Sequence, residues 1–280
     1  MLPKRLPLRG SLFYYIIPHM KRILCIITLF IIILSLSGCG GTASVEVFPS
    51  PEASPSASPT LYPEVSYESC SKPLIGIDVS AWQGDIDWKA VSEDNIDFAI
   101  IRLGYRGYIE GILHTDDCFE QNIRGAEAAG LLRGVYFFSQ ADSEESAAEE
   151  AEYVIGVLKG DELELPVVFD WEHITAEKGK LRKDAITFNT KPEEAATYAK
   201  VFCRALEKEG YETAVYISLD APELSPDISV IEDTRLWLAD LNDVPIRDFD
   251  VWCWQYDAHG SVKGVDGDVD LNVLFAMENP

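Results

Sequence analysis

Acidic side chains that follow apolar segments are the residues of this chain best placed to do chemistry. Asp170 and Glu172 stand at the end of the apolar run at residues 165–170. Alternation along a strand sends the two carboxyl groups of an Asp-x-Glu pair to one side and turns Trp171 to the other. Two close carboxyl groups cannot ionise independently, so the pKa of one rises and a protonated acid stands beside a charged group. Cleavage of a glycosidic bond needs that combination.

Two more acids extend this pattern. Asp78 ends the apolar run at residues 74–78, and Asp270 lies near the C-terminus in Gly-Asp-Val-Asp-Leu-Asn at residues 267–272. In parallel α/β folds, sites form at the carboxyl ends of strands. A single acid at such a place can equally well cap the next helix, so the Asp-x-Glu pair is what favours a site.

The sequence contains only incomplete versions of the motifs for metal binding and for nucleophilic catalysis. The Asp-x-Asp-x-Asp run that begins at Asp266 imitates the start of a calcium loop. Leu271 replaces the glycine needed at the sixth position of such a loop, and Met277 replaces the bidentate acid at the twelfth. The histidines have no Gly-x-Ser-x-Gly elbow beside them, and His173 should point away from Glu172, towards the surface or a supporting role. We therefore expect neither a metal nor a cofactor.

Aromatic residues supply a second argument. Flat rings near strand ends can stack on the apolar faces of sugars, although core packing explains most aromatic residues of a barrel without a ligand. Their position near strands that end in carboxylates favours a carbohydrate ligand. The aromatic residues concerned are Tyr136, Phe138, Trp237, Trp252, Trp254 and Tyr256.

Apolar and amphipathic segments alternate from residue 74 onwards. Continuous apolar strands separated by helices are typical of a parallel sheet that is covered on both faces. We predict an α/β fold, an irregular TIM-like β/α barrel of about eight strands that forms a single catalytic domain, with a doubly wound open sheet as the alternative. The predicted strands are 74–78, 98–103, 133–138, 165–170, 214–217, 236–239 and 251–256, and the predicted helices are 116–130, 143–158 and 192–210.

The N-terminus predicts export. Residues 1–38 contain a basic flank, an apolar run and small residues at its end, which indicates a secretory signal, with Met20 as an alternative start. Leu-Ser-Gly-Cys at residues 36–39 resembles the bacterial lipobox, so we expect Cys39 to be lipid-modified. An uncleaved anchor is the alternative, and both place the body of the protein outside the membrane and tethered to it.

Residues 39–72 predict a disordered linker, because a tract rich in Ser, Pro, Thr and Ala cannot bury enough apolar surface to fold. The catalytic domain then covers residues 73–280. Four cysteines remain in or next to it, an even number in an oxidising compartment. We expect buried free thiols or at most one bridge among Cys70, Cys118, Cys203 and Cys253.

Charge excludes one class of partner. The chain has 47 acidic and 23 basic residues among 280, a net charge of −24. A body this acidic is repelled by phosphate backbones, so we expect no nucleic-acid binding. We expect the protein to be a monomer.

Several motifs together resemble the family-25 glycoside hydrolases, which are lysozymes of the N-acetylmuramidase type. The resemblance covers essentially all of residues 74–280, in order. It implies an irregular β/α barrel with a groove over the carboxyl ends of the strands. The motifs are residues 76–88 (GIDVSAWQGDIDW), 98–105 (FAIIRLGY), 134–138 (GVYFF), 166–172 (PVVFDWE), 237–239 (WLA), 254–256 (WQY) and 269–272 (VDLN).

The resemblance also implies roles for individual residues. Glu172 matches the general acid and Asp170 its partner, while Asp78 and Asp270 match the acids of the opening and closing motifs. The implied substrate is peptidoglycan, cut at the β-1,4 bond after N-acetylmuramic acid, outside the cytoplasm. Tyr136, Trp237 and Gln255 fall where the family lines its sugar groove.

Two alternatives to a muramidase stay open. A catalytically silent peptidoglycan-binding lipoprotein is disfavoured because no carboxylate of the pattern is lost. Another N-acetylhexosamine-specific glycosidase, such as a chitinase-like enzyme, is disfavoured by the opening and closing motifs. Asp170 can orient the 2-acetamido group of the sugar as an internal nucleophile or assist a water molecule directly, and both mechanisms remain open.

Overall fold

The structure is a computed structural model that describes residues 73–176, 179–219, 221–241 and 251–275. The predicted signal, the lipidation site Cys39, the linker and Cys70 lie outside the described residues. Within the described ranges, no helix combines the length and the apolar character that a membrane crossing requires.

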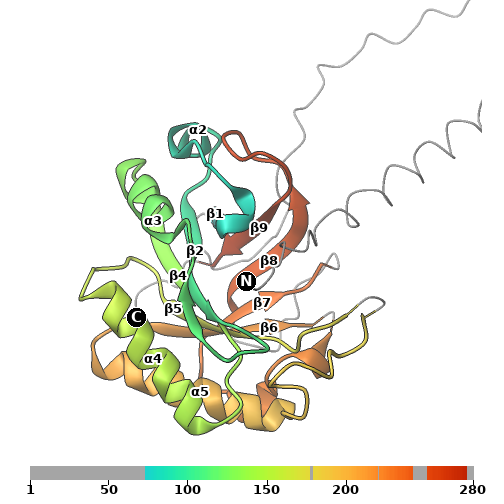
Figure 1. The fold of residues 1–280 in the computed structure, drawn as a ribbon. Coiled ribbons are helices and arrows are strands. Elements are labelled where there is room, and N and C mark those ends of the chain that lie inside the picture. Colours follow the sequence, from blue (N-terminus) through green and yellow to red (C-terminus); the bar gives the residue numbers. More distant parts are fainter. Residues whose placement is uncertain (1–72, 177–178, 220, 242–250, 276–280) are drawn as a thin grey trace, which may run out of the picture. The chain divides into compact units, whose positions relative to one another are not determined.

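Eight of the described strands form a closed barrel, whose strands are labelled in Figure 1. Neighbours follow the order β1-β9-β8-β7-β6-β5-β4-β2, and pairing of β1 with β2 closes the ring. The short strand β3 pairs with residues 104–106 of β2, beyond the point where the pairing with β1 ends. The irregular TIM-like barrel is confirmed, and the open doubly wound sheet is wrong. The strands are β1 (Leu74–Val79), β2 (Phe98–Arg106), β3 (Leu113–Thr115), β4 (Leu132–Ser139), β5 (Val167–Trp171), β6 (Thr213–Ser218), β7 (Leu236–Ala239), β8 (Val251–Gly260) and β9 (Val269–Leu274).

Strand direction decides which residues meet at one end of the barrel. All neighbouring pairs from β1 through β2 and β4 to β8 are parallel, but β9 is antiparallel to both β8 and β1. The start of β9 therefore lies at the end where the other strands finish. In this register Asp270 stands directly opposite Asp78.

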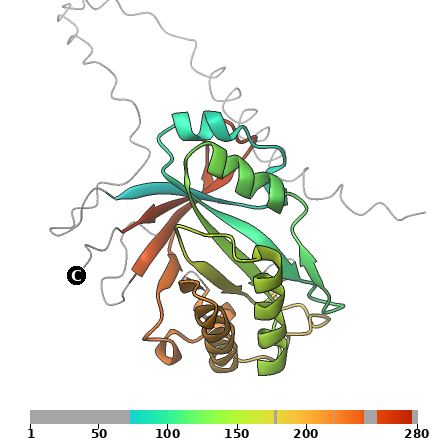
Figure 2. The same ribbon diagram turned by 90° about the vertical axis from the view of Figure 1, so that its left-hand side faces the viewer.

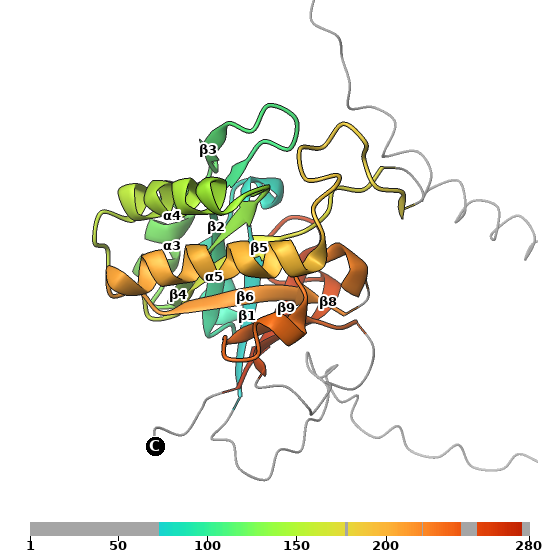
Figure 3. The same ribbon diagram turned by 90° about the horizontal axis from the view of Figure 1, so that it is seen from below.

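Four α-helices in the described part of the chain cover part of the barrel. Figure 2 shows α2 and α3 on one side and α4 and α5 on the other, and Figure 3 shows α4 and α5 side by side against the strands. After β6 the only helical segments in the described residues are the short 3-10 turns η3 (Pro222–Leu224) and η4 (Ile228–Val230), which makes the barrel irregular. The helices are α2 (Trp88–Glu93), α3 (Phe119–Ala128), α4 (Glu144–Leu158) and α5 (Pro192–Lys208).

The predicted helices are confirmed with narrower bounds because local signals set their ends. Ser143 caps α4 by accepting a hydrogen bond from the Ser146 backbone N–H. Pro192 opens α5, where a missing N–H costs nothing. The helix α2 and the strands β3 and β9 were not predicted as elements, since two of them are very short and β9 reads first as an acidic motif.

The barrel interior changes from apolar to polar along its axis. Alternate residues of each strand point inwards, and those near the strand starts form an apolar cluster that includes Phe98, Ile100 and Val168. Gly76 is part of this arrangement, because a Cβ atom there would lie 2.4 Å from the Phe98 ring. Towards the carboxyl ends of the strands the inward-facing residues become polar, and there they line a groove.

A second apolar layer lies between the barrel and its helices. Phe137 and Phe169 of the strands pack against Phe202 of α5, with ring centroids 6.4 and 5.1 Å away. Trp171 belongs to this layer, is 0% exposed and donates its indole N–H to the Ala141 carbonyl at 2.9 Å. The prediction that Trp171 turns away from its two acidic neighbours is confirmed.

Candidate active site

A groove of about 910 Å³ opens at the carboxyl ends of the parallel strands. Its floor is the polar end of the barrel interior, and its walls are the loops that follow β2 and β5. All the catalytic and substrate-binding residues predicted from the sequence line this groove. They are Asp78, Asp170, Glu172, Asp270, Tyr136, Trp237 and Gln255.

Asp78 and Asp270 form a hydrogen-bonded carboxyl pair on the floor. Asp78 is 6% exposed and accepts hydrogen bonds from the amide groups of Gln255 and Asn272, both at 2.8 Å. Burial raises the pKa of Asp78, although the hydrogen bonds from Asn272 and Gln255 lower it in part. Burial, together with the charge of Asp78, raises the pKa of Asp270 to about 8. The pair therefore keeps a proton at neutral pH, and the two amide N–H donors on Asp78 favour the charge there and the proton on Asp270.

Asp170 lies deeper in the groove than its partner. It is 6% exposed, and its Oδ1 is buried without a hydrogen-bond partner among the described residues. Burial raises its pKa well above the ordinary value, with the charges of Glu172 and Asp78 as further causes, and Arg102 opposes the rise. A buried carboxylate oxygen with nothing bound to it is free to accept a hydrogen bond from a ligand.

Glu172 is the first residue after β5 and is half-buried at the groove wall. Burial, with the charge of Asp78 as a smaller cause, raises its pKa to about 7. A glutamic acid that keeps its proton close to neutral pH can serve as a general acid. The arrangement provides one protonated acid next to a second carboxyl group with a free oxygen.

The three predicted sugar-binding residues occupy different places in the groove. Tyr136 is half-buried in its lining. Trp237 is only 2% exposed and donates its indole N–H to Asn272 at 2.8 Å. Gln255 uses its amide oxygen to accept the Tyr216 hydroxyl at 3.0 Å and its amide nitrogen to bind Asp78. Trp237 and Gln255 therefore shape the floor and support Asp78.

Several groove residues were not predicted. Trp82 is 85% exposed at the rim, at the centre of the short turn η1 (Ala81–Gln83), whose N-cap is Ser80. Arg102 lines the groove and is ion-paired with Asp116 at 2.7 Å. The motifs already contained both residues, but nothing in their spacing showed that they face the groove. Tyr105, Tyr108 and Tyr216 complete the unpredicted aromatic lining.

Some aromatic residues and His173 lie elsewhere than expected. Trp252 packs in the apolar barrel interior, and Trp254 donates its indole N–H to the Asp240 carbonyl at 2.8 Å. His173 is 8% exposed and packs edge-on against Trp171, with ring centroids 4.7 Å apart, so the surface position is wrong. Its backbone N–H donates to the Leu224 carbonyl at 2.9 Å, and its ring is hydrogen-bonded to the backbone of Thr190.

No cysteine of the described ranges lines the groove. Cys118, Cys203 and Cys253 are free thiols; Cys203 and Cys253 are buried as expected, whereas Cys118 is only half-buried at the N-cap of α3. In the same ranges, no group of three or more His, Cys, Asp or Glu side chains is placed to hold a metal ion.

Comparison with known proteins gives consistent matches. The profile of Glycosyl hydrolases family 25 matches residues 77–265. Lysozyme M1 of Streptomyces globisporus is 30% identical over 208 residues, which cover 70% of this chain and 66% of that protein. The Autolytic lysozyme of Clostridium acetobutylicum is 26% identical over 198 residues, which cover 70% of this chain and 54% of that protein. The structure of a family 25 glycosyl hydrolase from Bacillus anthracis matches with a TM-score of 0.57 at 25% identity, covering 76% of this chain and 96% of that one.

These matches fall on the barrel and on the groove residues. The chain spans 66% and 54% of the length of the two lysozymes, so they resemble it over the barrel and extend beyond the match. The family profile covers well over half of the chain and includes Asp78, Asp170 and Glu172. The chain belongs to the glycosyl hydrolases of family 25.

Proposed function

We propose that this protein is a peptidoglycan hydrolase, a muramidase that cleaves the β-1,4 bond between N-acetylmuramic acid and N-acetylglucosamine. The observation that carries the proposal is the convergence of four carboxyl groups in one groove, with the pKa of Glu172 raised to about 7. Family membership and the lysozymes among its relatives support the substrate class.

Glu172 acts as the general acid in this proposal. It donates its proton to the glycosidic oxygen as the bond to the departing sugar breaks. The groove around it keeps the proton in place up to about neutral pH, because burial disfavours the charged form. Donation leaves Glu172 negatively charged, and that charge is then available to draw a proton from the attacking nucleophile or water.

Asp170 assists the attack on the anomeric carbon. Its free Oδ1 accepts a hydrogen bond from the acetamido N–H of the sugar, or from a water molecule if the attack is direct. While Glu172 keeps its proton, one of the causes that raise the pKa of Asp170 is removed, and Arg102 favours the ionised form; burial and the charge of Asp78 still oppose ionisation. The charged Asp78 supplies further negative potential for the positive sugar ring of the transition state.

Digestion of purified peptidoglycan tests the proposal directly. The full chain, solubilised in detergent, is expected to release fragments whose new reducing ends are N-acetylmuramic acid, identified by mass spectrometry after borohydride reduction. New reducing ends of N-acetylglucosamine would place the cut at the other bond. An absence of new ends would support a silent binding protein, and faster cleavage of chitin oligosaccharides than of wall would support another N-acetylhexosaminidase.

We also propose that the protein is lipid-anchored through Cys39 and acts on the cell-wall side of the membrane. The support is the Leu-Ser-Gly-Cys sequence after an apolar run, followed by a linker of about 30 residues that reaches on the order of 90 Å. Such a linker allows a tethered barrel to reach the surrounding polymer.

Cys39→Ala is expected to release the protein from membranes into the medium, because an acyl chain contributes about 0.8 kcal/mol per buried CH₂ to membrane binding. Membrane fractionation and intact mass of the mature N-terminus measure the effect. Cys253→Ala removes a buried thiol and leaves the anchor, so it should stay in the membrane fraction. Membrane retention of Cys39→Ala with an uncleaved N-terminus would contradict lipidation and favour an anchor helix.

A further inference from the structure

We propose that Gln140 is the positioning residue of the general acid, because its carboxamide holds the main chain of Glu172. The buried ion pair Arg106–Glu150 in turn holds the backbone of Gln140. The inference deepens the proposed function and rests on it. None of these three residues belongs to the predicted catalytic set. Their role follows from a chain of hydrogen bonds that ends at Glu172.

Glu172 needs such support because the sheet does not hold it. Pairing between β5 and β6 ends at Phe169 and Val215, and pairing between β4 and β5 ends at Ser139 and Trp171. The carbonyl of Glu172 lies beyond both ladders. It accepts a hydrogen bond from Gln140 Nε2 at 2.8 Å.

The carboxamide of Gln140 is fixed in one orientation. Gln140 is 0% exposed, and its Nε2 donates to the carbonyls of Ser139 and Glu172, both at 2.8 Å. Its Oε1 accepts the hydroxyl of Thr187 at 2.8 Å. A flipped amide would point its oxygen at two carbonyl oxygens and its nitrogen at a donor, so only this orientation satisfies all three partners.

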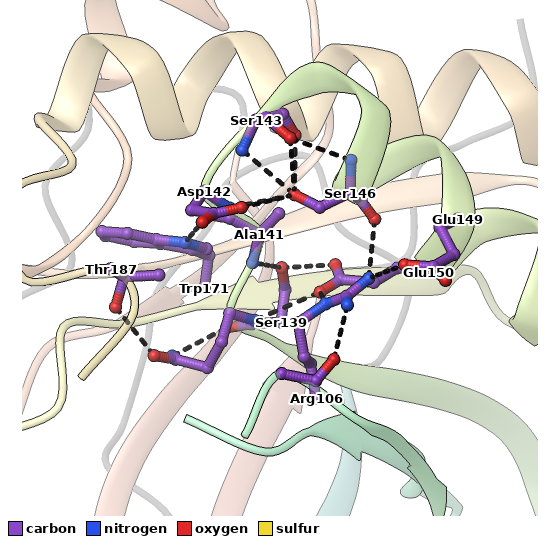
Figure 4. A network of polar contacts seen from close by, with 12 residues as sticks. Arg106, Ser139, Ala141, Asp142, Ser143, Ser146, Glu149, Glu150, Trp171 and Thr187 are labelled. Carbon is purple, nitrogen blue, oxygen red and sulfur yellow. Dashed lines mark hydrogen bonds and ion pairs between the residues drawn. The ribbon is translucent and has the colours of Figure 1, made fainter. Parts of the chain in front are cut away.

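Glu150 of α4 secures the backbone that carries Gln140. The carboxylate of Glu150 is 0% exposed and accepts the Ser139 hydroxyl at 2.6 Å and the Gln140 backbone N–H at 3.3 Å. Arg106 of β2 donates to the same carboxylate at 2.7 Å. Figure 4 shows Arg106 reaching Glu150 from one side and Thr187 lying at the opposite end of the network.

Arg106 connects this network to the groove wall. Its guanidinium also donates to the carbonyl of Gly111 at 2.7 Å and to the carbonyl of Ser146 in α4 at 3.0 Å. The loop that Gly111 closes contains Tyr108 and Ile109, which line the groove. One buried network therefore holds both the wall of the groove and the main chain of the acid.

Displacement of Glu172 should change its proton affinity. The groups that face it are Asp78 on β1, Asp170 on β5, Tyr216 on β6 and Asp270 on β9. A freed main chain lets the carboxyl group turn towards the open groove, where burial and these neighbours act on it less. Its pKa then falls towards the ordinary value.

Two matched threonine variants test the proposal with minimal change of shape. Thr187→Val removes the hydroxyl that orients Gln140, while Thr213→Val removes a hydroxyl that binds Glu207 at 2.8 Å at the start of β6, far from the groove. Both side chains are buried: Thr187 is 0% exposed and Thr213 is 8% exposed. Gln140→Leu is the stronger variant of the same site, and Thr187→Val keeps the test valid if Gln140→Leu does not fold.

The expected result is a loss of kcat with little change of KM. Misplacement of a catalytic group by about 1 Å costs up to about 10²-fold, so Thr187→Val should lose about tenfold in kcat on wall fragments and Gln140→Leu about 10²-fold. The alkaline limb of kcat should move to lower pH by about 0.5 unit or more in both. Thr213→Val should keep the wild-type kcat and alkaline limb.

Carbon-13 NMR titration of the Glu172 carboxyl group, assigned by its absence in Glu172→Gln, gives a readout that does not need activity. A lower pKa in Thr187→Val but not in Thr213→Val supports positioning. An unchanged pKa and an unchanged kcat in folded Thr187→Val would overturn it, even with an active wild type. A wild type that does not cut the wall, with the pKa difference intact, would overturn the proposed function and leave the positioning role standing.

Discussion

Glu172→Gln is expected to abolish wall lysis, with a loss of about 10²-fold or more in kcat, because the amide keeps the shape of the side chain but has no proton to give. Glu172 is the carboxyl group whose pKa of about 7 lets it hold a proton at the pH of the reaction. Binding of wall fragments should persist, since the groove lining is unchanged. Reducing-end release and fragment binding by calorimetry measure the two effects separately.

The pH dependence of the wild type follows from the same shift. The active form of Glu172 is protonated, so activity is present below the raised pKa and falls as the pH rises through about 7. The raised pKa also means that ionisation of Glu172 disfavours the folded state. Protonated Glu172 therefore contributes to the free energy of unfolding at low pH, and this contribution is lost as the pH rises from 4.5, the ordinary pKa, to about 7, the pKa in the folded protein. Glu172→Gln should therefore melt a few degrees higher than wild type at pH 8 and show no such gain at pH 4.

Glu164→Gln is the matched control for Glu172→Gln. Glu164 lies just before the start of β5, whereas Glu172 follows its end. Glu164 is ion-paired with Arg133 at 2.8 Å, which lowers the pKa of Glu164. Its loss should cost some stability at neutral pH and leave lysis unchanged. Lysis by Glu172→Gln within about threefold of wild type would contradict the acid assignment, because loss of a general acid costs at least about 10²-fold.

The sequence allowed the barrel and the groove lining to be predicted because both depend on local patterns. Apolar runs that end in carboxylates indicated the strands and the end at which their acids meet. The pairing of β9 with β1 was beyond such reasoning, since an antiparallel return strand that closes a barrel is set by long-range contacts. The face-to-face position of Asp78 and Asp270 depends on that pairing.

The residues that hold the groove acids in place could not be predicted from the sequence either. Gln140 and Asn272 are polar residues in or next to apolar strands, and sequence alone does not tell a buried amide from an exposed one. Asn272 belongs to the closing motif, yet its function of holding Asp78 and Trp237 appears only when the register brings all three together. Arg106 and Glu150 are 44 residues apart, and charge patterning along the chain does not reveal such a pair.

Asp170→Asn is expected to lose about 10²- to 10³-fold in kcat, because an amide polarises the acetamido group less and carries no charge to stabilise the positive sugar ring. The Oδ1 of Asp170 has no hydrogen-bond partner among the described residues, so its partner in the working enzyme comes from the ligand or from water. Asp97→Asn removes the same charge at the opposite end of the barrel, where Asp97 accepts the Ile75 backbone N–H at 3.0 Å, and should retain activity.

The substrate separates the two mechanisms that Asp170 allows. If the acetamido group is the internal nucleophile, wall glycans whose muramic acids are de-N-acetylated should resist cleavage, since a free amine cannot form the cyclic intermediate. Direct attack by water predicts a milder penalty, because the missing acetyl group then costs only binding contacts. Matched rates on normal and de-N-acetylated wall, with Asp170→Asn still impaired, would exclude substrate assistance. In that case the free oxygen of Asp170 orients the water, and its charge alone accounts for the loss in the asparagine variant.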